Sequence, residues 1–540
     1  MIFKDETGRR IMDPDLNKEI IAKHYEDLYS QGNAPPHPHH EYVTNKVSSL
    51  SQETTCNPLL DAVPTKEEIK TAIANKKNGK ATTDWKNEIL KRGGSPMVDL
   101  IYPVIKVFWK EHPPRQWNEG IISNVWKGKG DREQMSNQRG ITVSSSVAAI
   151  AEEIITDRLL ETINFTQSQA GASTADHIFI LKSLISLAIK RGMELILTFY
   201  DIKKAYDRAD MDDMLNVVNE QGFTGKIWRL TKSFNKDLTA RVKTKAGFTR
   251  QIERDKGGKQ GGKIMVPLDA KMMDTLSEDL SQNPNLGIKI NDLSICCLEY
   301  VDDVTTMATG YKQQEMTLRA LYEFALKRQL EWGAEKCKVM EIGSHKEKKS
   351  EWKLGDKTIT KCHSYRYLGE EISRDGKNKS NLEERFKKIK GSVMAIITCG
   401  RSDIMKKIET KVLLKLHETV TIPAYLYNAE TWNLNNGEKK EVDRMEIWAL
   451  KHMLGLPTTT PTPAVIFATG TLYASVRVNV KQLIYLQQLL QKEDHHWAKM
   501  TLRLLDQYQI GWAKMIHEIL TSWDLEKDWN IIEKKSETSK

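Results

Sequence analysis

Adjacent carboxylates at Asp302 and Asp303 could do metal-dependent chemistry, because apolar residues flank them on both sides. The runs 295–300 and 304–307 each have the length and composition of a short buried strand, with the acids at the turn between them. A carboxylate buried at such a turn must be paired or bound to a metal ion, since burying an unpaired charge is costly. Asp-Asp is also an ordinary turn sequence, so the pair alone decides nothing.

Asp201 adds a third carboxylate in a matching position, at the end of the apolar and aromatic run 195–200. If this strand and the one at 304–307 are neighbours in one sheet, Asp201 and Asp302 meet at the same edge. Acids that converge there could hold two Mg²⁺ ions about 3.5–4 Å apart, which would activate a hydroxyl and neutralise charge on a transferred phosphoryl group. Hard oxygen ligands without a Cys/His cluster favour Mg²⁺, with Mn²⁺ as a substitute, over zinc.

The elements that must position these acids mix helix and strand patterns without strict βαβ repetition. Helices are predicted from Thr65 to about Lys76 and at 99–109, 148–160, 174–190, 203–219 and 314–332, and a further strand at 121–126. This order predicts an α+β fold with a mixed sheet.

Beyond about residue 375 the pattern becomes helical, with apolar residues at helical spacing over 382–396 and 404–416. Basic residues lie off both apolar stripes: Arg385, Lys387, Lys388 and Lys390 on the first, and Lys406, Lys407, Lys411 and Lys415 on the second. A solvated face explains either helix alone, whereas two in succession strengthen the case for contact with a polyanion.

The segments Phe199–Asp207 (FYDIKKAYD) and Tyr300–Asp303 (YVDD) resemble motifs A and C of reverse transcriptases, in particular the LINE-type, non-long-terminal-repeat retrotransposon enzymes. Further resemblances follow in family order over about residues 10–480: early fingers motifs at 76–84 and 127–131, the NYRGI element at 137–142, motif B at 259–261, motif D at 336–340, the primer grip at 365–369 and the thumb signature at 422–432. The resemblance implies a right-hand polymerase with fingers, palm and helical thumb. Its implied activity is RNA-directed DNA synthesis from dNTPs, on an RNA template and a DNA or RNA primer.

The resemblance also implies catalytic roles. Asp201 and Asp302 would be the metal ligands, helped by the Ile202 carbonyl, and Asp303 a nearby carboxylate of lesser weight. Lys336 would give a proton to the leaving pyrophosphate, a role for which Lys338 competes.

In the implied nucleotide site, Lys127 and Arg139 would hold the triphosphate. Lysine supplies a point charge and arginine a bidentate contact, and both suit phosphate groups. Tyr206 resembles the steric gate that rejects a ribose 2′-hydroxyl, although core packing would also suit a tyrosine. Gln260 and Gly261 would lie against the nucleotide and template, where glycine permits close backbone approach.

Two segments depart from the family pattern. The run Gly262–Pro267 lacks the usual Ser before Pro and is one residue longer, and 169–176 lacks basic residues before its Ser-Thr. These departures suit an alternative in which the chain is a catalytically impaired or domesticated RNA-binding scaffold. A second alternative is a metal-dependent nuclease or phosphatase, for which Tyr206, Lys127 and Arg139 have no obvious purpose.

The predicted organisation has five parts: an N-terminal extension (1–60), fingers (61–190), palm (191–345), primer-grip segment (346–375) and helical thumb with C-terminal region (376–540). In the extension, prolines and histidines at 33–40 are interpreted as an extended linker and not as a metal site. The endonuclease that usually precedes such an enzyme is not recognised, so a separate endonuclease domain or protein is an expected partner.

Composition excludes several classes of protein. The 540 residues carry a net charge of +9 with 39% hydrophobic and 28% charged residues, a globular balance that permits a polyanionic partner. No apolar run is long enough to span a membrane and no signal peptide opens the chain, so we expect an intracellular protein, nuclear or cytoplasmic, with no membrane partner. Six scattered cysteines indicate a reducing compartment.

Three further groups have plain structural interpretations. Asp210, Asp212 and Asp213 are predicted to form a solvated helix face, and Cys296 and Cys297 to pack within a strand. Trp432 and Trp448 are predicted to lie in the thumb core.

Overall fold

The apolar run 195–200 forms the middle of a mixed sheet that carries both acidic segments. In the computed structural model, which describes residues 3–4, 7–30, 37–53, 55–110, 113–169, 173–259, 261–343, 351–399 and 408–525, the strands of this central sheet pair in the order β12-β13-β11-β3-β10-β9. They are β3 (Leu195–Tyr200), β9 (Cys297–Tyr300), β10 (Asp303–Ala308), β11 (Lys338–Ile342), β12 (Trp352–Leu354) and β13 (Lys357–Lys361). The predicted strand at 195–200 is confirmed to the residue.

Helices cover both faces of the central sheet, which explains why every residue of β3 is buried. Ile196 and Tyr200 share a core with α11 and α12, whereas Leu197 and Phe199 share another with α7, α19 and α20. These helices are α7 (Thr174–Arg191), α11 (Met265–Ser281), α12 (Tyr311–Lys327), α19 (Trp497–Gln507) and α20 (Gly511–Ser522). A small hairpin, β7 (Ile288–Ile290) with β8 (Leu293–Ile295), joins the second core.

The N-terminal lobe is built on a second sheet, in which the described strands pair in the order β2-β1-β4-β5 with β6 beside β4. The strands are β1 (Glu119–Trp126), β2 (Gln138–Val143), β4 (Leu238–Thr244), β5 (Gly247–Phe248) and β6 (Ile252–Arg254). The helices of this lobe and its junction with the central sheet are α1 (Pro14–Tyr29), α2 (Pro38–Gln52), α3 (Lys66–Asn75), α4 (Asn87–Arg92), α5 (Gly94–Lys110), η1 (Arg115–Trp117), η2 (Met135–Asn137), α6 (Ser146–Thr162), α8 (Ala205–Arg208), α9 (Met211–Glu220) and α10 (Gly225–Phe234). The predicted helix start is confirmed, because Thr65 and Glu68 form a capping box.

The C-terminal lobe is helical and follows the hairpin of β14 (Ser364–Tyr367) and β15 (Glu370–Ser373). Its elements are α13 (Lys379–Cys399), α14 (Thr410–Leu416), the π-helical η4 (His417–Thr421), α15 (Ile422–Tyr425), η5 (Ala429–Thr431), α16 (Asn436–Met453), α17 (Thr462–Thr469) and α18 (Ala474–Gln491). Trp432 is fully buried in this lobe and Trp448 packs against the same core, as predicted.

The predicted basic face of α13 is wrong at one position. Arg385 is buried and pairs with Glu370, a buried carboxylate that also accepts hydrogen bonds from Lys182 Nζ and Trp432 Nε1. Lys387 and Lys390 are exposed, as expected for a basic face. Of the second predicted basic helix, Lys411 and Lys415 lie on α14 and are exposed, whereas residues 401–407 lie outside the described part of the chain.

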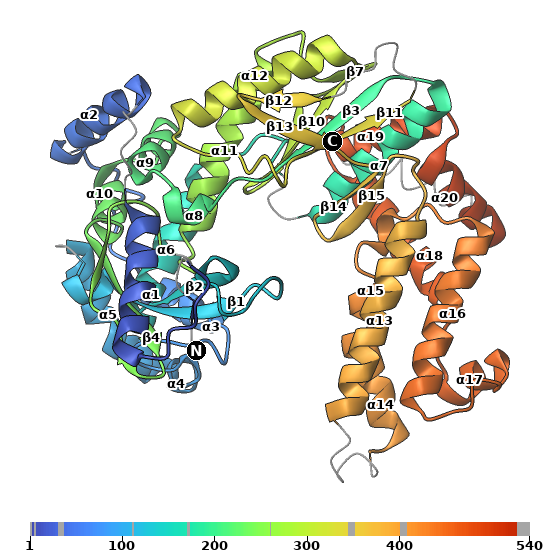
Figure 1. Ribbon diagram of the computed structural model, residues 1–540, viewed down its shortest axis with the longest axis horizontal. Helices are drawn as coiled ribbons and strands as arrows, with labels where there is room; N and C mark the ends of the chain where they lie inside the picture. The colour runs from blue at the N-terminus through green and yellow to red at the C-terminus, as the bar shows by residue number, and fades with distance from the viewer. Residues whose placement is uncertain are drawn as a thin grey trace.

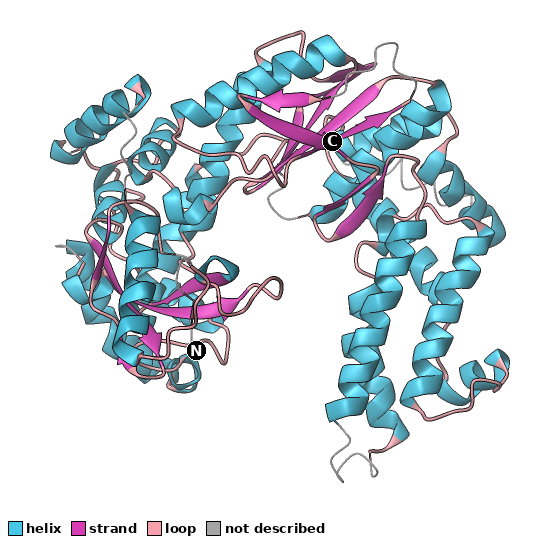
Figure 2. Cartoon of the chain, viewed as in Figure 1, coloured by secondary structure: helices cyan, strands magenta, loops and turns pink. Residues whose placement is uncertain are grey.

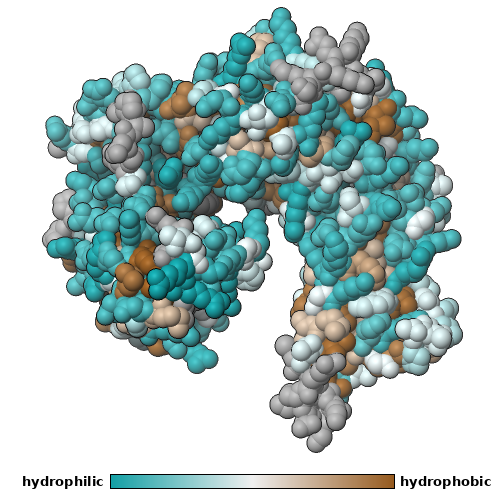
Figure 3. All heavy atoms as spheres, in the orientation of Figure 1, coloured by the Kyte–Doolittle hydropathy of each residue, from teal (hydrophilic) through white to brown (hydrophobic). Residues whose placement is uncertain are grey.

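The three parts together form an open C (Figure 1). The N-terminal lobe and the C-terminal helices hang from opposite ends of the central sheet, and the strands that form that sheet lie at the top of the arch (Figure 2). The space-filling view shows an open cleft between the two lobes, with mostly hydrophilic side chains along its rim (Figure 3). Among the described helices, none combines the length and apolarity that crossing a membrane requires.

The predicted helix at 203–219 is interrupted. The chain forms one turn, α8, and then leaves the helical region at Ala209 before α9 begins. Asp210 caps α9 by accepting hydrogen bonds from the N–H groups of Asp212 and Asp213, which is why a new helix starts there. The predicted helix at 314–332 is likewise too long, because α12 ends at Lys327 and Gln329 has a left-handed φ of 53°.

The predicted linker at 33–40 is wrong for its last residues. Pro38 occupies the first turn of α2, where its missing N–H costs nothing, and His37 caps that helix. His39 and His40 contact Asp213 and Asp210, so α2 is attached to α9. Residues 31–36 lie outside the described part of the chain.

Candidate active site

The acidic segments meet at one edge of the central sheet. β3 and β10 are antiparallel neighbours with Tyr200 opposite Val304, so Asp201, the next residue after β3, lies level with the start of β10. β9 and β10 form a hairpin in which Tyr300 pairs with Asp303, leaving Val301 and Asp302 as its two-residue turn. The strands at 195–200 and 303–308 are therefore neighbours, which is the condition under which Asp201 and Asp302 were expected to meet.

Electrostatics confirms that these carboxylates are close to one another. Burial raises the pKa of Asp302, and the negative charge of Asp201 raises it further. Burial, followed by the charges of Asp302 and Asp201, raises the pKa of Asp303 to about 6, although this residue is in part exposed to solvent. Lys336 opposes these shifts, and its Nζ donates a hydrogen bond to Asp201 Oδ2 at 2.6 Å.

The turn that presents Asp302 is strained and is held by a side chain from outside the motif. Val301 has a φ of 57°, a left-handed conformation that a β-branched residue rarely adopts. Its N–H donates to Gln169 Oε1 at 2.8 Å, and Gln169 Nε2 donates to the Ala270 carbonyl on α11 at 3.2 Å. Gln169 is buried, so it fixes the turn against the helix beneath it.

The donor set fits magnesium. Across the described residues, no three His, Cys, Asp or Glu side chains converge closely enough to form a ready-made metal site. Magnesium characteristically takes only one or two protein carboxylates and completes its shell with water and substrate phosphates. Asp201, Asp302 and the Ile202 carbonyl supply hard oxygen atoms of that kind, and Ile202 is fixed by a backbone bridge to Trp332.

Cations from the N-terminal lobe face this edge. Lys127 follows β1, and its Nζ donates to the Ser136 carbonyl at 2.7 Å, while Arg139 is exposed on β2. Burial lowers the pKa of Lys127, and the positive charges of Lys204, Lys336 and Arg139 lower it further, so these four cations lie near one another. Such a cluster suits a polyanionic group such as a triphosphate.

Lys336 and Lys338 were both candidates for the residue that gives a proton to the leaving pyrophosphate. Of the two, Lys336 contacts Asp201. Lys338 Nζ instead donates to Thr360 Oγ1 and to the Glu335 carbonyl, so it is committed to β13 and the adjacent loop.

The glycine-containing segment after β6 is anchored by buried charges. Lys259 is buried, donates to the carbonyls of Trp117 and Phe234, and has its pKa lowered to about 8 by burial. Gly261 has a φ of 110°, which only glycine adopts without strain. Gln260 and the side chain of Tyr206 lie outside the described residues, so their predicted roles stay predictions.

Sequence reasoning missed three residues near the site. Gln169 and Lys204 lie in the segments 169–176 and 199–207, but neither residue was assigned a role of its own from the sequence. Asp269 on α11 is buried, and burial together with the charge of Asp302 raises its pKa to about 8. The sequence signal that could have identified Asp269 is an acidic residue among the apolar positions of a predicted helix.

The predicted solvated face at 210–213 is wrong for Asp213. This residue is buried, pairs with Arg328 and contacts His39 Nε2 at 3.3 Å. It therefore joins α9 to α2 and to the end of α12. Cys297 is buried on β9, as predicted, whereas half-buried Cys296 lies in the bend between β8 and β9 and not within a strand.

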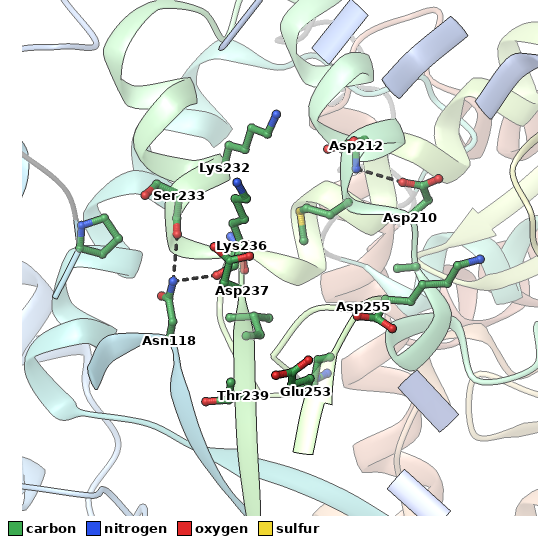
Figure 4. A pocket seen from close by; sticks show the side chains of 18 of the residues that line it. Asn118, Asp210, Asp212, Lys232, Ser233, Lys236, Asp237, Thr239, Glu253 and Asp255 are labelled. Atoms are coloured by element: carbon green, nitrogen blue, oxygen red, sulfur yellow. Dashed lines mark hydrogen bonds between the residues drawn. The ribbon is translucent and has the colours of Figure 1, made fainter. Parts of the chain in front are cut away.

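A cavity of about 890 Å³ lies within the N-terminal lobe, between α9, α10, β4 and β6. Its lining mixes acids and bases, including Asp210, Asp212, Lys232, Lys236 and Glu253 (Figure 4). Residues 254–257, which lead into the segment anchored by Lys259, also border it. Residues 254–257 therefore have open space beside them.

Comparison with known proteins identifies the domain. A family model described as reverse transcriptase (RNA-dependent DNA polymerase) matches residues 127–372, which include both acidic segments and the cation cluster. Residues 127–372 therefore resemble a reverse transcriptase domain. The α+β right-hand polymerase fold expected from the sequence is thereby confirmed.

Two relatives place this domain among retrotransposon proteins. The chain is 22% identical over 364 residues to the Pol polyprotein of the type-1 retrotransposable element R2 from Popillia japonica, covering 65% of this chain and 49% of that protein. It is also 22% identical over 336 residues to a 149 kDa protein of transposon TX1 from Xenopus laevis, covering 56% and 24%. The resemblance to non-long-terminal-repeat retrotransposon enzymes is confirmed, while the chain spans half or less of either relative.

Among solved structures, telomerase from Candida albicans in complex with a fragment of telomeric RNA aligns with a TM-score of 0.39 and 12% identity, over 69% of this chain and 68% of that one. A likeness this loose supports no further step.

Proposed function

We propose that this chain is the RNA-directed DNA polymerase of a non-long-terminal-repeat retrotransposon and extends a DNA or RNA primer along an RNA template. The observation that carries the proposal is the convergence of Asp201 and Asp302 at one sheet edge, where Lys336, one of four neighbouring cations, donates a hydrogen bond to Asp201. The proposal needs both groups of residues. The acids suit metal-dependent phosphoryl transfer, and the cations suit binding of the triphosphate that this reaction consumes.

Reverse transcriptase domains generally use divalent metal ions. Asp201, Asp302 and the Ile202 carbonyl would hold two Mg²⁺ ions, which when bound would activate the primer 3′-hydroxyl and neutralise charge on the α-phosphate. Lys127 and Arg139 would hold the triphosphate. Lys336 keeps a proton at Nζ beside Asp201, where it can be passed to the leaving pyrophosphate.

The remaining assignments follow from the same proposal. The N-terminal lobe corresponds to fingers, the central sheet to palm, the β14–β15 hairpin to the primer grip and the C-terminal helices to thumb. Tyr206 on α8 stays the proposed steric gate, and Gln260 and Gly261 the proposed contacts to nucleotide and template. A separate endonuclease domain or protein stays a proposed partner.

Primer extension tests the proposal. The purified chain should incorporate dTTP on poly(rA)/oligo(dT) with Mg²⁺, and Asp302→Ala should abolish incorporation. Asp292→Ala, which changes an exposed aspartate in the turn between β7 and β8, is the matched control and should extend normally. Equal incorporation by Asp302→Ala would refute the site.

An RNA-binding scaffold is the second candidate, because the run Gly262–Pro267 lacks the usual Ser before Pro. Tight RNA binding without any incorporation by the wild-type chain would favour the scaffold. Cleavage of labelled RNA without dNTPs would instead favour a nuclease.

A further inference from the structure

Helix α1, from the segment expected to be accessory, contacts the strand that carries Arg139. Tyr25 lies so close to Gly140 that a Cβ added there would be 2.5 Å from Tyr25 Oη. The Tyr25 hydroxyl donates to Asn124 Oδ1 on β1 at 2.5 Å, three residues before Lys127. Tyr25 therefore spans the two paired strands whose ends carry the cations proposed to bind the triphosphate.

The same helix also holds the segment that leads to Gly261. The Tyr29 ring lies under the Arg254 guanidinium, 4.0 Å from its centre, and the Tyr29 carbonyl accepts a hydrogen bond from Lys256 N–H at 3.1 Å. Arg254 in turn donates to the Gly258 carbonyl. Arg254 and Tyr29 are both buried, so this chain of contacts is shielded from water.

A third residue of α1 faces the cation cluster itself. Burial, together with the charges of Lys204 and Lys127, lowers the pKa of His24 to about 4. His24 is thus a neutral neighbour of the cations, and it packs edge-to-face on Tyr25. α1 also contacts α8, the turn that carries Tyr206.

Several features fix α1 in this position. Ile21, Ala22 and Leu28 share a core with Ile122 of β1 and Val242 of β4. On the outer side, Arg250 forms ion pairs with both Glu19 and Glu26. The helix is therefore an integral part of the lobe, whereas residues 254–257 border an open cavity.

We propose that α1 is a positioning element of the nucleotide pocket, in which Tyr25 fixes the strands bearing Arg139 and Lys127, and Tyr29 fixes Arg254 and thereby the 258–261 segment. The proposal deepens the polymerase assignment and rests on it. It predicts that changes in α1 alter the binding of dNTP more than the binding of template–primer or the chemical step.

Two variants of Tyr29 separate the ring from its hydroxyl. Tyr29 Oη has no hydrogen-bond partner among the described residues, so Tyr29→Phe should leave KM for dTTP within twofold of wild type. Tyr29→Leu keeps an apolar side chain but removes the ring beneath Arg254, and should raise KM for dTTP about tenfold. kcat and the Kd for poly(rA)/oligo(dT) should change less than twofold, and Lys23→Ala on the exposed face of α1 should change none of these values.

Hydrogen exchange gives a readout that needs no activity. In the free protein, Tyr29→Leu should speed exchange in peptides covering 254–264 and leave α16 unchanged, whereas Tyr29→Phe should match wild type throughout. Unchanged exchange and unchanged KM in a folded Tyr29→Leu variant would overturn the proposal, as would equal losses in Tyr29→Phe. Faster exchange over 254–264 together with no incorporation by wild type would support the positioning role while refuting the polymerase function.

Discussion

Replacing Gln169 by Met should slow catalysis while leaving the fold intact. The substitution keeps the length and most of the volume of the side chain but removes both amide hydrogen bonds. Val301 N–H would lose its acceptor at 2.8 Å, and the Ala270 carbonyl would lose a donor at 3.2 Å. Because Ala270 lies within α11, its carbonyl belongs to a helix that can satisfy it, and the effect falls mainly on the turn.

The magnitude follows from two contributions at Val301. An unsatisfied, half-buried donor costs about 1–3 kcal/mol. The left-handed conformation of a non-glycine residue costs about 1–2 kcal/mol, which the hydrogen bond to Gln169 currently offsets. If the turn relaxes to escape about 2 kcal/mol of this, the population that presents Asp302 correctly falls roughly thirtyfold, and we expect kcat to fall by about 10- to 30-fold.

Single-nucleotide incorporation under pre-steady-state conditions measures this change directly. Gln167→Met is the matched control, because Gln167 also makes two amide hydrogen bonds but to His495 and Trp497 near α19, away from the turn. Val301→Gly in the Gln169→Met background should restore several-fold of the lost rate, since glycine adopts the left-handed conformation freely. Unchanged kcat in Gln169→Met, or equal losses in the two Met variants, would refute the reasoning.

Three further changes test charges elsewhere in the chain. The pKa of Lys259 is lowered to about 8 in the folded protein, so between pH 8 and 10.5 the unfolded chain binds one more proton than the folded protein. The free energy of unfolding of the wild type should therefore rise with pH relative to that of Lys259→Met. Denaturant titrations should show a difference of about 2 kcal/mol between pH 7.5 and 9.5. Parallel curves for the two proteins would contradict this. Glu370→Ala leaves buried cations unpaired and should lower the free energy of unfolding of the C-terminal lobe by about 3–5 kcal/mol, against about 0.5 or less for exposed Glu383→Ala. Burial and the charge of Arg366 both contribute to the lowered pKa of Lys388, so these two cations lie near each other beside the β14–β15 hairpin. Arg366→Ala should reduce the slope of log Kd for template–primer against log salt by about 0.7–0.9, and an unchanged slope would show that Arg366 contacts no phosphate.

Local sequence features predicted the elements that depend on local physics. The strand at 195–200 was identified from an unbroken apolar run, and the helix after Thr65 from a capping box, and both have the expected bounds. The predictions failed where a partner distant in sequence decides the outcome. Asp213 looks like a surface acid until Arg328, 115 positions later, pairs with it. Arg385 looks like part of a basic face until Glu370 of the β14–β15 hairpin pairs with it.

The candidate site divides in the same way. The acids were recognised from residue type and position, and one pairing of strands brings Asp201 and Asp302 together. Lys127, Arg139 and Lys336 were recognised only through the resemblance to reverse transcriptases. The residues that orient them were not recognised. Gln169 contacts the turn that carries Asp302 through its side-chain amide, although Gln169 and Val301 are 132 positions apart, and no local pattern indicates such a contact.

This division has a mechanistic consequence. A motif acid such as Asp302 has no substitute, so its loss should abolish incorporation outright. Supporting residues act by stabilising one backbone arrangement over its alternatives by only a few kcal/mol, so their loss should give graded effects that depend on which arrangement they hold. Gln169 holds the turn that carries Asp302, and its variants should lower kcat; Tyr29 supports the nucleotide segment, and its variants should raise KM. If both classes of variant instead changed kcat and KM in a fixed ratio, the turn and the nucleotide segment would move as one unit, and the contacts through Gln169 and Tyr29 would not be separate supports.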